Sequence, residues 1–271
     1  MEHHISWLTL LVNRYLGGFA LQIFQALRIT PADSVNPIPD HLVMLMLAVL
    51  IGTLLALWLR PRLSVENPGG LQQIAEMLLT NPLGFGIKDL LEENAGHAGL
   101  KYVPMVGSIS VLILLSNLLG VIPTLSSPTA EVSVPLGCAI VTFLYFNWQG
   151  IRHHGAGGYL KHFAGPIWWL APLMFPVEII STCARILSLT VRLWANIFAS
   201  DLLYVIFLGL LVQPVLWGME RSPAVGAVLG IFPAVIPLAF VGLHIFVSII
   251  QTYVFTLLPA MYIGFATAEE H

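Results

Sequence analysis

The sequence predicts an all-α protein that crosses a lipid bilayer several times. Hydrophobic residues fill 57% of its 271 positions and charged residues only 9%, whereas soluble domains carry about 25% charged residues. Apolar stretches of about bilayer length recur along the chain, and the last two are far longer than one crossing needs. We expect an N-terminal span, a surface helix, two further spans and two long tilted membrane helices.

The N-terminal part is interpreted as an extracytoplasmic segment, residues 1–40, followed by a single membrane domain, residues 41–271. The start of the chain lacks the basic region of a secretory signal. Residues 30–39 are rich in Pro, Asp and Ser, which indicates a linker.

Charged residues mark the ends of the first three spans. Residues 41–59 have no formal charge and precede Arg60 and Arg62, which predicts the first span. Residues 63–101 mix charges with apolar positions at helical spacing, as in a helix on the membrane surface. Residues 103–124 and 131–148 predict two further crossings.

The basic residues indicate the orientation. Cytoplasmic loops are enriched in Lys and Arg. The loops after the first and third predicted spans lie on the same side of the membrane, because two crossings separate them. They contain Arg60, Arg62, Lys88, Lys101, Arg152 and Lys161. The loop at 125–131 has neither residue type. We therefore expect the N-terminus outside and the C-terminus in the cytoplasm of a bacterial inner membrane.

The last hundred residues form two very long apolar segments, 172–217 and 222–268, separated by a break at 217–223. Each would be about 70 Å long as a helix, while an upright span needs only about 30 Å. Each segment is thus either two short crossings or one long, tilted and kinked helix.

The first long segment contains ionisable groups, which are costly inside a membrane and therefore indicate function. Glu178, Arg185, Arg192 and Asn196 share one helical face, with Ser188 near it, and Asp201 falls about 180° round from Arg192. In the second segment His244, Ser248 and Gln251 share a face. Two polar stripes of this kind can line a wet, proton-conducting path.

Plainer interpretations exist for most of these residues. Glu178 could cap a helix, Arg185 could reach the interface with its long side chain, His244 could be a packed histidine and Asp201 an interfacial acid. Arg192 resists such an explanation, because it lies in mid-segment and cannot lose its charge by deprotonation.

Other classes of function find little support. The net charge of −3 is too small to indicate nucleic-acid binding. Cys138 and Cys183 form no motif, and the pairs His3-His4 and His153-His154 are assigned to loops without spaced partners, so neither a disulfide nor a metal site is predicted. There is no phosphate loop and no nucleophile with a base, so we expect no cofactor and no catalytic site in this chain.

The stretch SLTVRLWAN, residues 188–196, resembles the signature of subunit a of F-type ATP synthases. The resemblance includes a glutamate fourteen residues before the arginine, at Glu178, and an acid nine residues after it, at Asp201. Asp201 departs from the family, which usually has the longer Glu there. Arg185 also departs, since some relatives have Lys or a neutral residue.

Further parts of the chain extend this resemblance, which covers about residues 40–271. His244 and Gln251 match a family His and a Gln seven residues later. The stretch NLLGVIP at 117–123 resembles an earlier family span, and the tail at 268–271 resembles bacterial members.

The resemblance implies a proton-translocating stator subunit that offers two half-channels to a rotating ring of c subunits. The two long helices would form a hairpin against that ring. Other implied partners are the b subunits of the peripheral stalk, the wider ATP synthase complex and the lipid bilayer, while ATP chemistry lies elsewhere in the complex.

The resemblance also implies residue roles. Arg192 would separate the half-channels and face a c-ring carboxylate, with Asn196 and Gln251 orienting water. Asp201 and His244 would line the outer half-channel, and Glu178 would lie on the cytoplasmic path. Minor contributors would be Arg185, Ser188 and Ser248.

The main alternative is a secondary transporter with buried charges, which would usually show an internal repeat; none is evident in the sequence. A haem-binding respiratory subunit would need paired membrane histidines, and only His244 lies clearly within a span. A purely structural assembly subunit would not need Arg192 together with His244 and Gln251.

Overall fold

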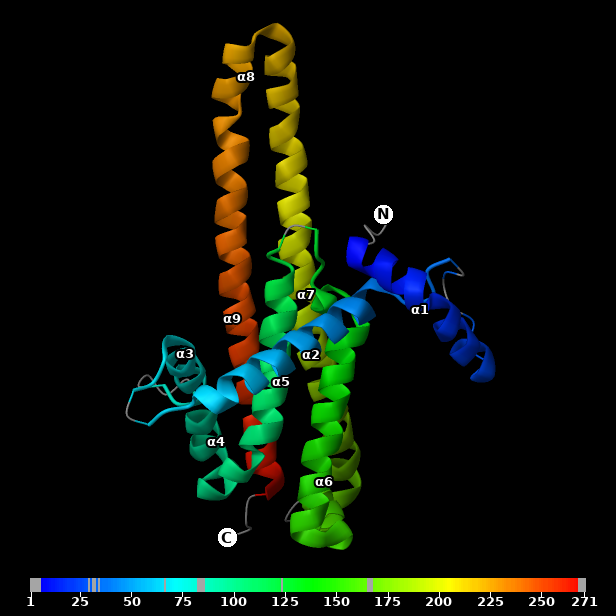
Figure 1. Cartoon of the computed structure of the whole chain (residues 1–271). Coiled ribbons are helices and arrows are strands. Elements are labelled where there is room, and N and C mark those ends of the chain that lie inside the picture. The colour runs from blue at the N-terminus through cyan, green and yellow to red at the C-terminus, as the bar shows by residue number, and fades with distance from the viewer. Residues whose placement is uncertain are drawn as a thin grey trace. The chain divides into compact units, whose positions relative to one another are not determined.

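A computed structural model describes the chain over residues 6–28, 30, 33, 35–65, 67–81, 86–122, 124–164 and 168–267. In these ranges the regular elements are helical (Figure 1). The α-helices are α1 Trp7–Ala26, α2 Asp40–Leu59, α3 Gly70–Leu79, α4 Ile87–Ala95, α5 Val103–Leu119, α6 Ser133–Ala164, α7 Ala171–Arg221, α8 Pro223–Leu229 and α9 Ile231–Thr267. Short 3₁₀ turns are η1 Arg60–Arg62, η2 His97–Tyr102, η3 Pro128–Ala130 and η4 Trp168–Leu170.

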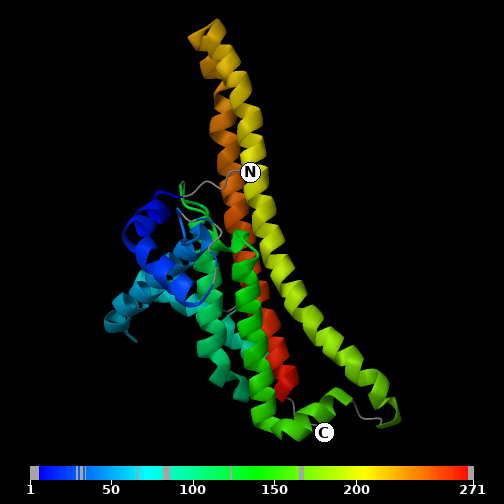
Figure 2. The same cartoon turned by 90° about the vertical axis from the view of Figure 1, so that its right-hand side faces the viewer.

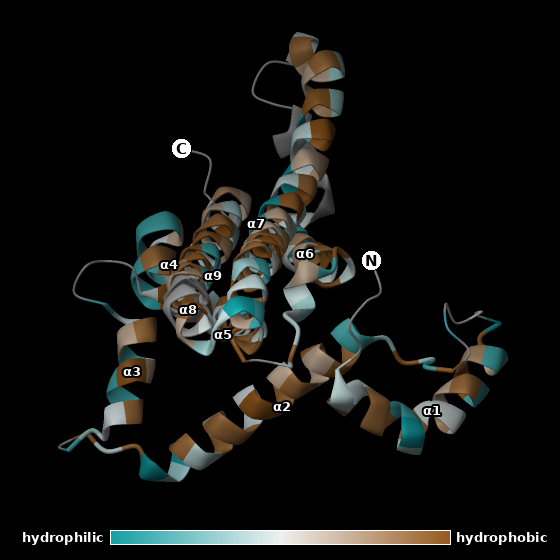
Figure 3. Ribbon diagram, turned by 90° about the horizontal axis from the view of Figure 1, so that it is seen from above, coloured by the Kyte–Doolittle hydropathy of each residue, from teal (hydrophilic) through white to brown (hydrophobic). Residues whose placement is uncertain are grey.

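Five helical segments in these ranges are long and apolar enough to cross a membrane: Asp40–Arg62, His97–Leu119, Ser133–Gly155, Ala171–Arg221 and Leu238–Ala266. Along α2 the apolar character is nearly continuous, as its brown colour in Figure 3 shows. The predicted all-α, multi-pass membrane fold is therefore confirmed.

The chain is built as two compact units, and α2, α5, α7 and α9 each contribute a part to both. The first unit consists of residues 1–48, 116–131 and 193–250. The second consists of residues 49–115, 132–192 and 251–271.

In the first unit, the N-terminal helix α1 is tied to the start of α2 through Asp40. Oδ1 of Asp40 accepts hydrogen bonds from Thr9 Oγ1 at 2.6 Å and from Ser6 Oγ at 2.7 Å. The other carboxylate oxygen accepts one from Ser126, in the segment between α5 and α6. A single carboxylate thus joins three parts of the unit.

The burial pattern of α1 is unusual for a helix of a soluble domain. Its polar residues Thr9 and Asn13 are buried, while its large apolar residues are exposed, including Trp7, Tyr15 and Phe19. The sequence analysis did not assign this helix. His3 and His4 lie outside the described residues, as does the tail at 268–271.

Also in the first unit, the second half of α7 and the first half of α9 run antiparallel and are joined through α8 (Figures 1 and 2). The rings of Phe207 and Phe240 pack across the pair with centroids 4.9 Å apart. The predicted break near 217–223 lies where α7 ends, at Arg221. Each long segment is mainly one helix rather than two short crossings.

The second unit has a core built where α4, α5, α6 and α9 meet. Leu91, Val106, Phe146 and Ile263 are almost fully buried in it. The backbones of α9 and α4 approach closely, since a Cβ on Gly264 would lie 2.1 Å from the carbonyl oxygen of Asn94. No side chain fits there, which is why glycine is required at this crossing.

Helix α6 extends beyond the predicted crossing at 131–148. It continues to Ala164 with a kink at Gly155, whose φ of 73° is the left-handed conformation that glycine tolerates. The assignment of His153 and His154 to a loop was wrong, because both are helical. The chain stays helical on both sides of this kink although the sequence becomes more polar after Trp148. Beyond the kink, Tyr159 donates a hydrogen bond to Asn147 Oδ1 at 3.0 Å, and its burial raises the pKa of the phenol.

The predicted surface region at 63–101 holds two helices, α3 and α4, rather than one. The span predicted at 103–124 ends as a helix at Leu119. The connection that follows contains Thr124 at a positive φ of 78°.

Candidate functional site

The first unit brings an acid on α7 next to a histidine on α9. Nδ1 of His244 lies 3.4 Å from Oδ1 of Asp201. The Asp201 side chain is 38% exposed and that of His244 only 7%. The pair therefore links an accessible carboxylate to a buried imidazole.

Two further contacts fix the ring of His244. Nε2 lies 3.0 Å from the backbone carbonyl oxygen of Asn117 in α5, and Nδ1 lies 3.1 Å from Oγ of Ser200. A carbonyl oxygen can only accept, so Nε2 must carry a hydrogen. The neutral ring then has its lone pair on Nδ1, where Ser200 can donate to it.

This arrangement makes Nδ1 the position that exchanges a proton. When it gains one, Nδ1 becomes a donor that faces the carboxylate of Asp201. When it loses the proton, the hydroxyl of Ser200 replaces it as donor. A histidine held in this way can accept and release a proton without turning its ring.

A cluster of buried polar groups surrounds the Asn117 side of the ring. Thr129 Oγ1 donates to Oδ1 of Asn117 at 2.5 Å, and Ser127 Oγ donates to the carbonyl oxygen of Ser116 at 3.2 Å. The Nδ2 of Asn117 and the Oγ of Ser116 are buried, with no hydrogen-bond partner among the described residues. Buried groups of this kind usually have a partner, often water.

Gly120 lets the connection after α5 approach the histidine. A Cβ at this position would lie 3.0 Å from Cβ of Ser127 and 3.3 Å from Nε2 of His244. Both separations are tighter than ordinary contact, so a larger residue would push against the ring.

Sequence reasoning paired His244 with Asp201 only through the family resemblance, and it missed Ser200, Ser127 and Thr129. The NLLGVIP stretch was noted for its resemblance, but nothing in it signals that the carbonyl of Asn117 holds His244. That contact joins residues 127 positions apart.

The second unit holds another pair of predicted residues. Arg185 Nη2 lies 3.3 Å from Oε1 of Glu178, two turns earlier on α7. The guanidinium also lies 5.1 Å from the ring centroid of Tyr262 on α9. Arg185 thus has a charged partner and an aromatic partner within its unit.

Arg192 differs from Arg185 in its surroundings. It is exposed and forms no ion pair with the described residues of its unit. On the continuous helix α7, Ser188 and Asn196 lie one turn before and one turn after it, and both are also exposed. The helix therefore carries an exposed polar stripe centred on an unpaired cation.

The remaining predicted residues lie on α9 below His244. Ser248 is fully buried, and its Oγ donates to the carbonyl oxygen of His244 at 2.7 Å. Gln251, which belongs to the second unit, is 5% exposed. The predicted helical face with His244, Ser248 and Gln251 is thus a buried face of α9.

Among the residues that the structure describes, no three His, Cys, Asp or Glu side chains gather closely enough to hold a metal ion. The chemistry that the arrangement can perform is proton exchange at His244 and Asp201, and charge recognition at Arg192.

Comparison with known proteins gives a family. The model of the ATP synthase A chain matches residues 41–264. The ATP synthase subunit a of Koribacter versatilis is 40% identical over 268 residues, 99% of each chain. That of Solibacter usitatus is 41% identical over 240 residues, 89% of this chain and 92% of the relative. That of Desulfosudis oleivorans is 40% identical over 75% of this chain and 77% of the relative. The chain therefore belongs to the ATP synthase A chain family.

Proposed function

We propose that this chain is the fixed membrane subunit of a proton-translocating F-type ATP synthase, with Arg192 as its central residue. In this role it offers protons a path to and from a rotating ring of c subunits. The observation that carries the proposal is the contact between Asp201 and His244, at 3.4 Å, in a chain of the ATP synthase A chain family.

The outer half-channel runs through Asp201 to His244. The exposed carboxylate collects a proton, and Nδ1 of His244 receives it while Nε2 stays bonded to Asn117. The buried polar atoms of Asn117 and Ser116 that have no partner among the described residues can bind water molecules, which supports a hydrated path beside the ring. Gln251 orients water further along α9, and Ser248 has a minor part there.

Arg192 separates the two half-channels. A buried carboxylate prefers to be neutral in lipid, and a facing cation stabilises its ionised form. A ring carboxylate that reaches Arg192 therefore releases its proton. The exposure of Arg192, and the absence of an ion pair with the described residues of its unit, support a partner charge supplied by another chain. A permanent cation there also repels protons that would leak straight through.

Asn196 and Glu178 complete this assignment. Asn196 lies one turn from Arg192 on the exposed stripe and orients water and the guanidinium. Glu178 lies on the path to the cytoplasm, where Arg185 holds it. Arg185 and Ser188 have minor roles.

The chain has no catalytic site of its own, and ATP is made or hydrolysed in other subunits. Its partners are the c-ring, the b subunits of the peripheral stalk and the remaining complex. Residues 1–40 form the extracytoplasmic segment and residues 41–271 one membrane domain. The N-terminus lies outside and the C-terminus in the cytoplasm of the bacterial inner membrane.

The test compares His244→Ala with wild type in the intact complex. Proton uptake driven by ATP is measured in inverted vesicles, together with the amount of assembled complex in the same membranes. The control is Ser108→Ala, because the exposed hydroxyl of Ser108 donates to the carbonyl oxygen of Pro104 in its own helix α5. We expect His244→Ala to lose most of its proton uptake at unchanged yield. A parallel loss of uptake and complex would mean that His244 is a packing residue.

A further inference from the structure

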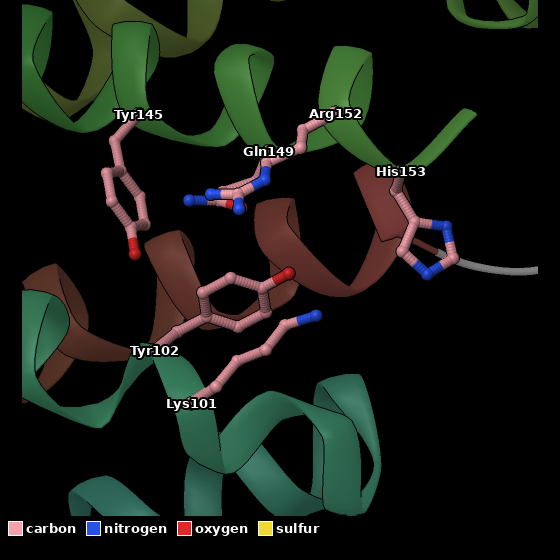
Figure 4. Close-up of a pocket in the computed structure, with 6 residues that line it drawn as sticks. All are labelled: Lys101, Tyr102, Tyr145, Gln149, Arg152 and His153. Carbon is pink, nitrogen blue, oxygen red and sulfur yellow. The ribbon is translucent and has the colours of Figure 1, made fainter. Parts of the chain in front are cut away.

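A polar cavity of about 440 Å³ lies in the second unit, between the start of α5 and the end of the crossing part of α6. It is lined by Lys101, Tyr102, Tyr145, Gln149, Arg152 and His153. None of the proposed proton-path residues lines it. Figure 4 shows Tyr145, Gln149 and Arg152 reaching from α6 toward Tyr102 and Lys101.

The charge of the lining favours an anion. Lys101 and Arg152 are cationic, and the described residues that line the cavity include no carboxylate. Neither Lys101 nor Arg152 forms an ion pair with the described residues of the second unit. Lys101 instead lies over the ring of Tyr102, 4.8 Å from its centroid. Two cations that face one cavity without an acid repel each other, and a bound anion removes that cost.

The neutral groups of the lining are hydrogen-bond donors. The rings of Tyr102 and Tyr145 meet edge to face, with centroids 6.2 Å apart. Their hydroxyls and the Gln149 amide can each donate to an oxygen. Arg, Lys and several such donors together suit a phosphate group, which has several acceptor oxygens.

The position of the cavity favours a lipid over a soluble phosphate. Lys101 lies near the beginning of the crossing segment His97–Leu119, and Arg152 near the end of Ser133–Gly155. Both therefore lie at the same membrane surface, where basic and tyrosine side chains meet lipid headgroups.

An exposed apolar stripe lies next to the polar one on α6. Tyr145, Gln149 and Arg152 are spaced by four and three residues, and so form one helical face. The residue before each of these three is apolar and exposed. These residues, Leu144, Trp148 and Ile151, are 60%, 64% and 40% exposed and form the apolar stripe. The two stripes are neighbours on the helix, about 100° apart.

We propose that this cavity binds the phosphate headgroup of an anionic phospholipid, with an acyl chain along Leu144, Trp148 and Ile151. Lys101 and Arg152 hold the phosphate, and the tyrosine and glutamine side chains orient it. The site is separate from proton transfer, so its test does not depend on pumping activity.

The first experiment titrates the purified intact complex with phosphatidylglycerol or phosphatidylcholine in a neutral detergent, with native mass spectrometry as readout. The variant is Lys101→Gln with Arg152→Gln. The matched control is Arg60→Gln with Lys88→Gln, which removes the same charge from exposed residues outside the cavity. Each basic residue contributes about 1 kcal/mol to binding at an anionic membrane, so we expect about 30-fold weaker phosphatidylglycerol binding at this site in the variant.

Several results would overturn the proposal. Equal phosphatidylglycerol binding by wild type and variant would do so, as would an equal loss in the control. Displacement of the lipid by inorganic phosphate at similar concentration would indicate a soluble-anion site instead.

A second measurement identifies the occupant directly. His153 is replaced by a photoreactive benzophenone amino acid, and native membranes are irradiated so that this side chain forms a covalent bond with whatever occupies the cavity. Cross-links to phospholipid support the proposal. Cross-links to an acidic segment of another subunit, with no lipid adduct, would contradict it.

Discussion

Nε2 of His244 lies 3.0 Å from the backbone carbonyl oxygen of Asn117, a contact between residues 127 positions apart. Because the carbonyl can only accept, this bond keeps one hydrogen on Nε2 and leaves Nδ1 as the exchanging nitrogen. Asp201 and Ser200 face that nitrogen. The backbone of α5 thus determines which nitrogen of the neutral His244 ring carries the hydrogen.

Asp201→Asn is expected to impair proton pumping severely. The amide keeps the size of the side chain but cannot take up a proton, so the step to Nδ1 loses its donor. We expect a fall of more than about tenfold in ATP-driven proton uptake at normal complex yield. Asp201→Glu keeps a carboxylate and should retain substantial uptake. If Asp201→Asn and wild type take up protons at equal rates, protons do not pass through this residue.

Gly120→Ala tests whether the ring position of His244 matters. The new Cβ would lie 3.3 Å from Nε2 and 3.0 Å from Cβ of Ser127. Overpacking of this kind costs about 1–3 kcal/mol, so we expect proton uptake to fall about tenfold or more as the ring is displaced. The control is Gly137→Ala, because a Cβ there meets nothing within 4 Å. Normal uptake in Gly120→Ala would mean that the ring tolerates displacement.

Asp40→Ala should release the N-terminal helix. Its carboxylate accepts hydrogen bonds from Ser6, Thr9 and Ser126, and a hydrogen bond to a charged group contributes about 1.5–3 kcal/mol. Hydrogen exchange of the α1 amides should become faster in the intact complex.

The control for that measurement is Asp33→Ala. Asp33 is exposed, and within the part of the chain that the structure describes it bonds only locally, to Val35 and Asn36. The bond to Val35 lowers the pKa of the Asp33 carboxyl. Unchanged exchange of α1 in Asp40→Ala would show that other contacts hold the helix.

Arg185→Gln should have a much milder effect than a change at Arg192. The Arg185 and Glu178 side chains are 29% and 40% exposed, and a pair this accessible contributes at most about 1 kcal/mol. We expect nearly normal complex yield and proton uptake reduced by less than about tenfold. Loss of all uptake in Arg185→Gln would place Arg185 itself on the proton path.

Much of the fold was predictable because long apolar stretches have few alternatives in a membrane. The span at 41–59 and the long apolar segment at 172–217 were located within a few residues of α2 and α7. Helix α1 was not assigned, because its polar face is satisfied by Asp40, far along the chain, and local pattern does not reveal that partner. The extension of α6 past Arg152 was missed because a rise in polarity was taken for a loop.

The candidate site was predictable in its residue types but not in its contacts. Spacing placed Glu178 and Arg185 on one helical face, and the family resemblance assigned Asp201 and His244 to one path. Ser200 could not be recognised, since a serine in a membrane helix usually bonds its own backbone. Only the packing of α7 on α9 in the first unit brings its hydroxyl to His244.

The role of Arg192 is tested most directly by ATP-driven acidification of inverted membrane vesicles that carry Arg192→Ala. Wild type and Arg221→Ala are compared at matched levels of assembled complex. Arg221 ends the same helix and stacks on Trp217 at 3.9 Å, away from the polar stripe. We predict that Arg192→Ala abolishes acidification while Arg221→Ala retains it. Normal acidification by Arg192→Ala would contradict the central claim that this arginine controls the proton path.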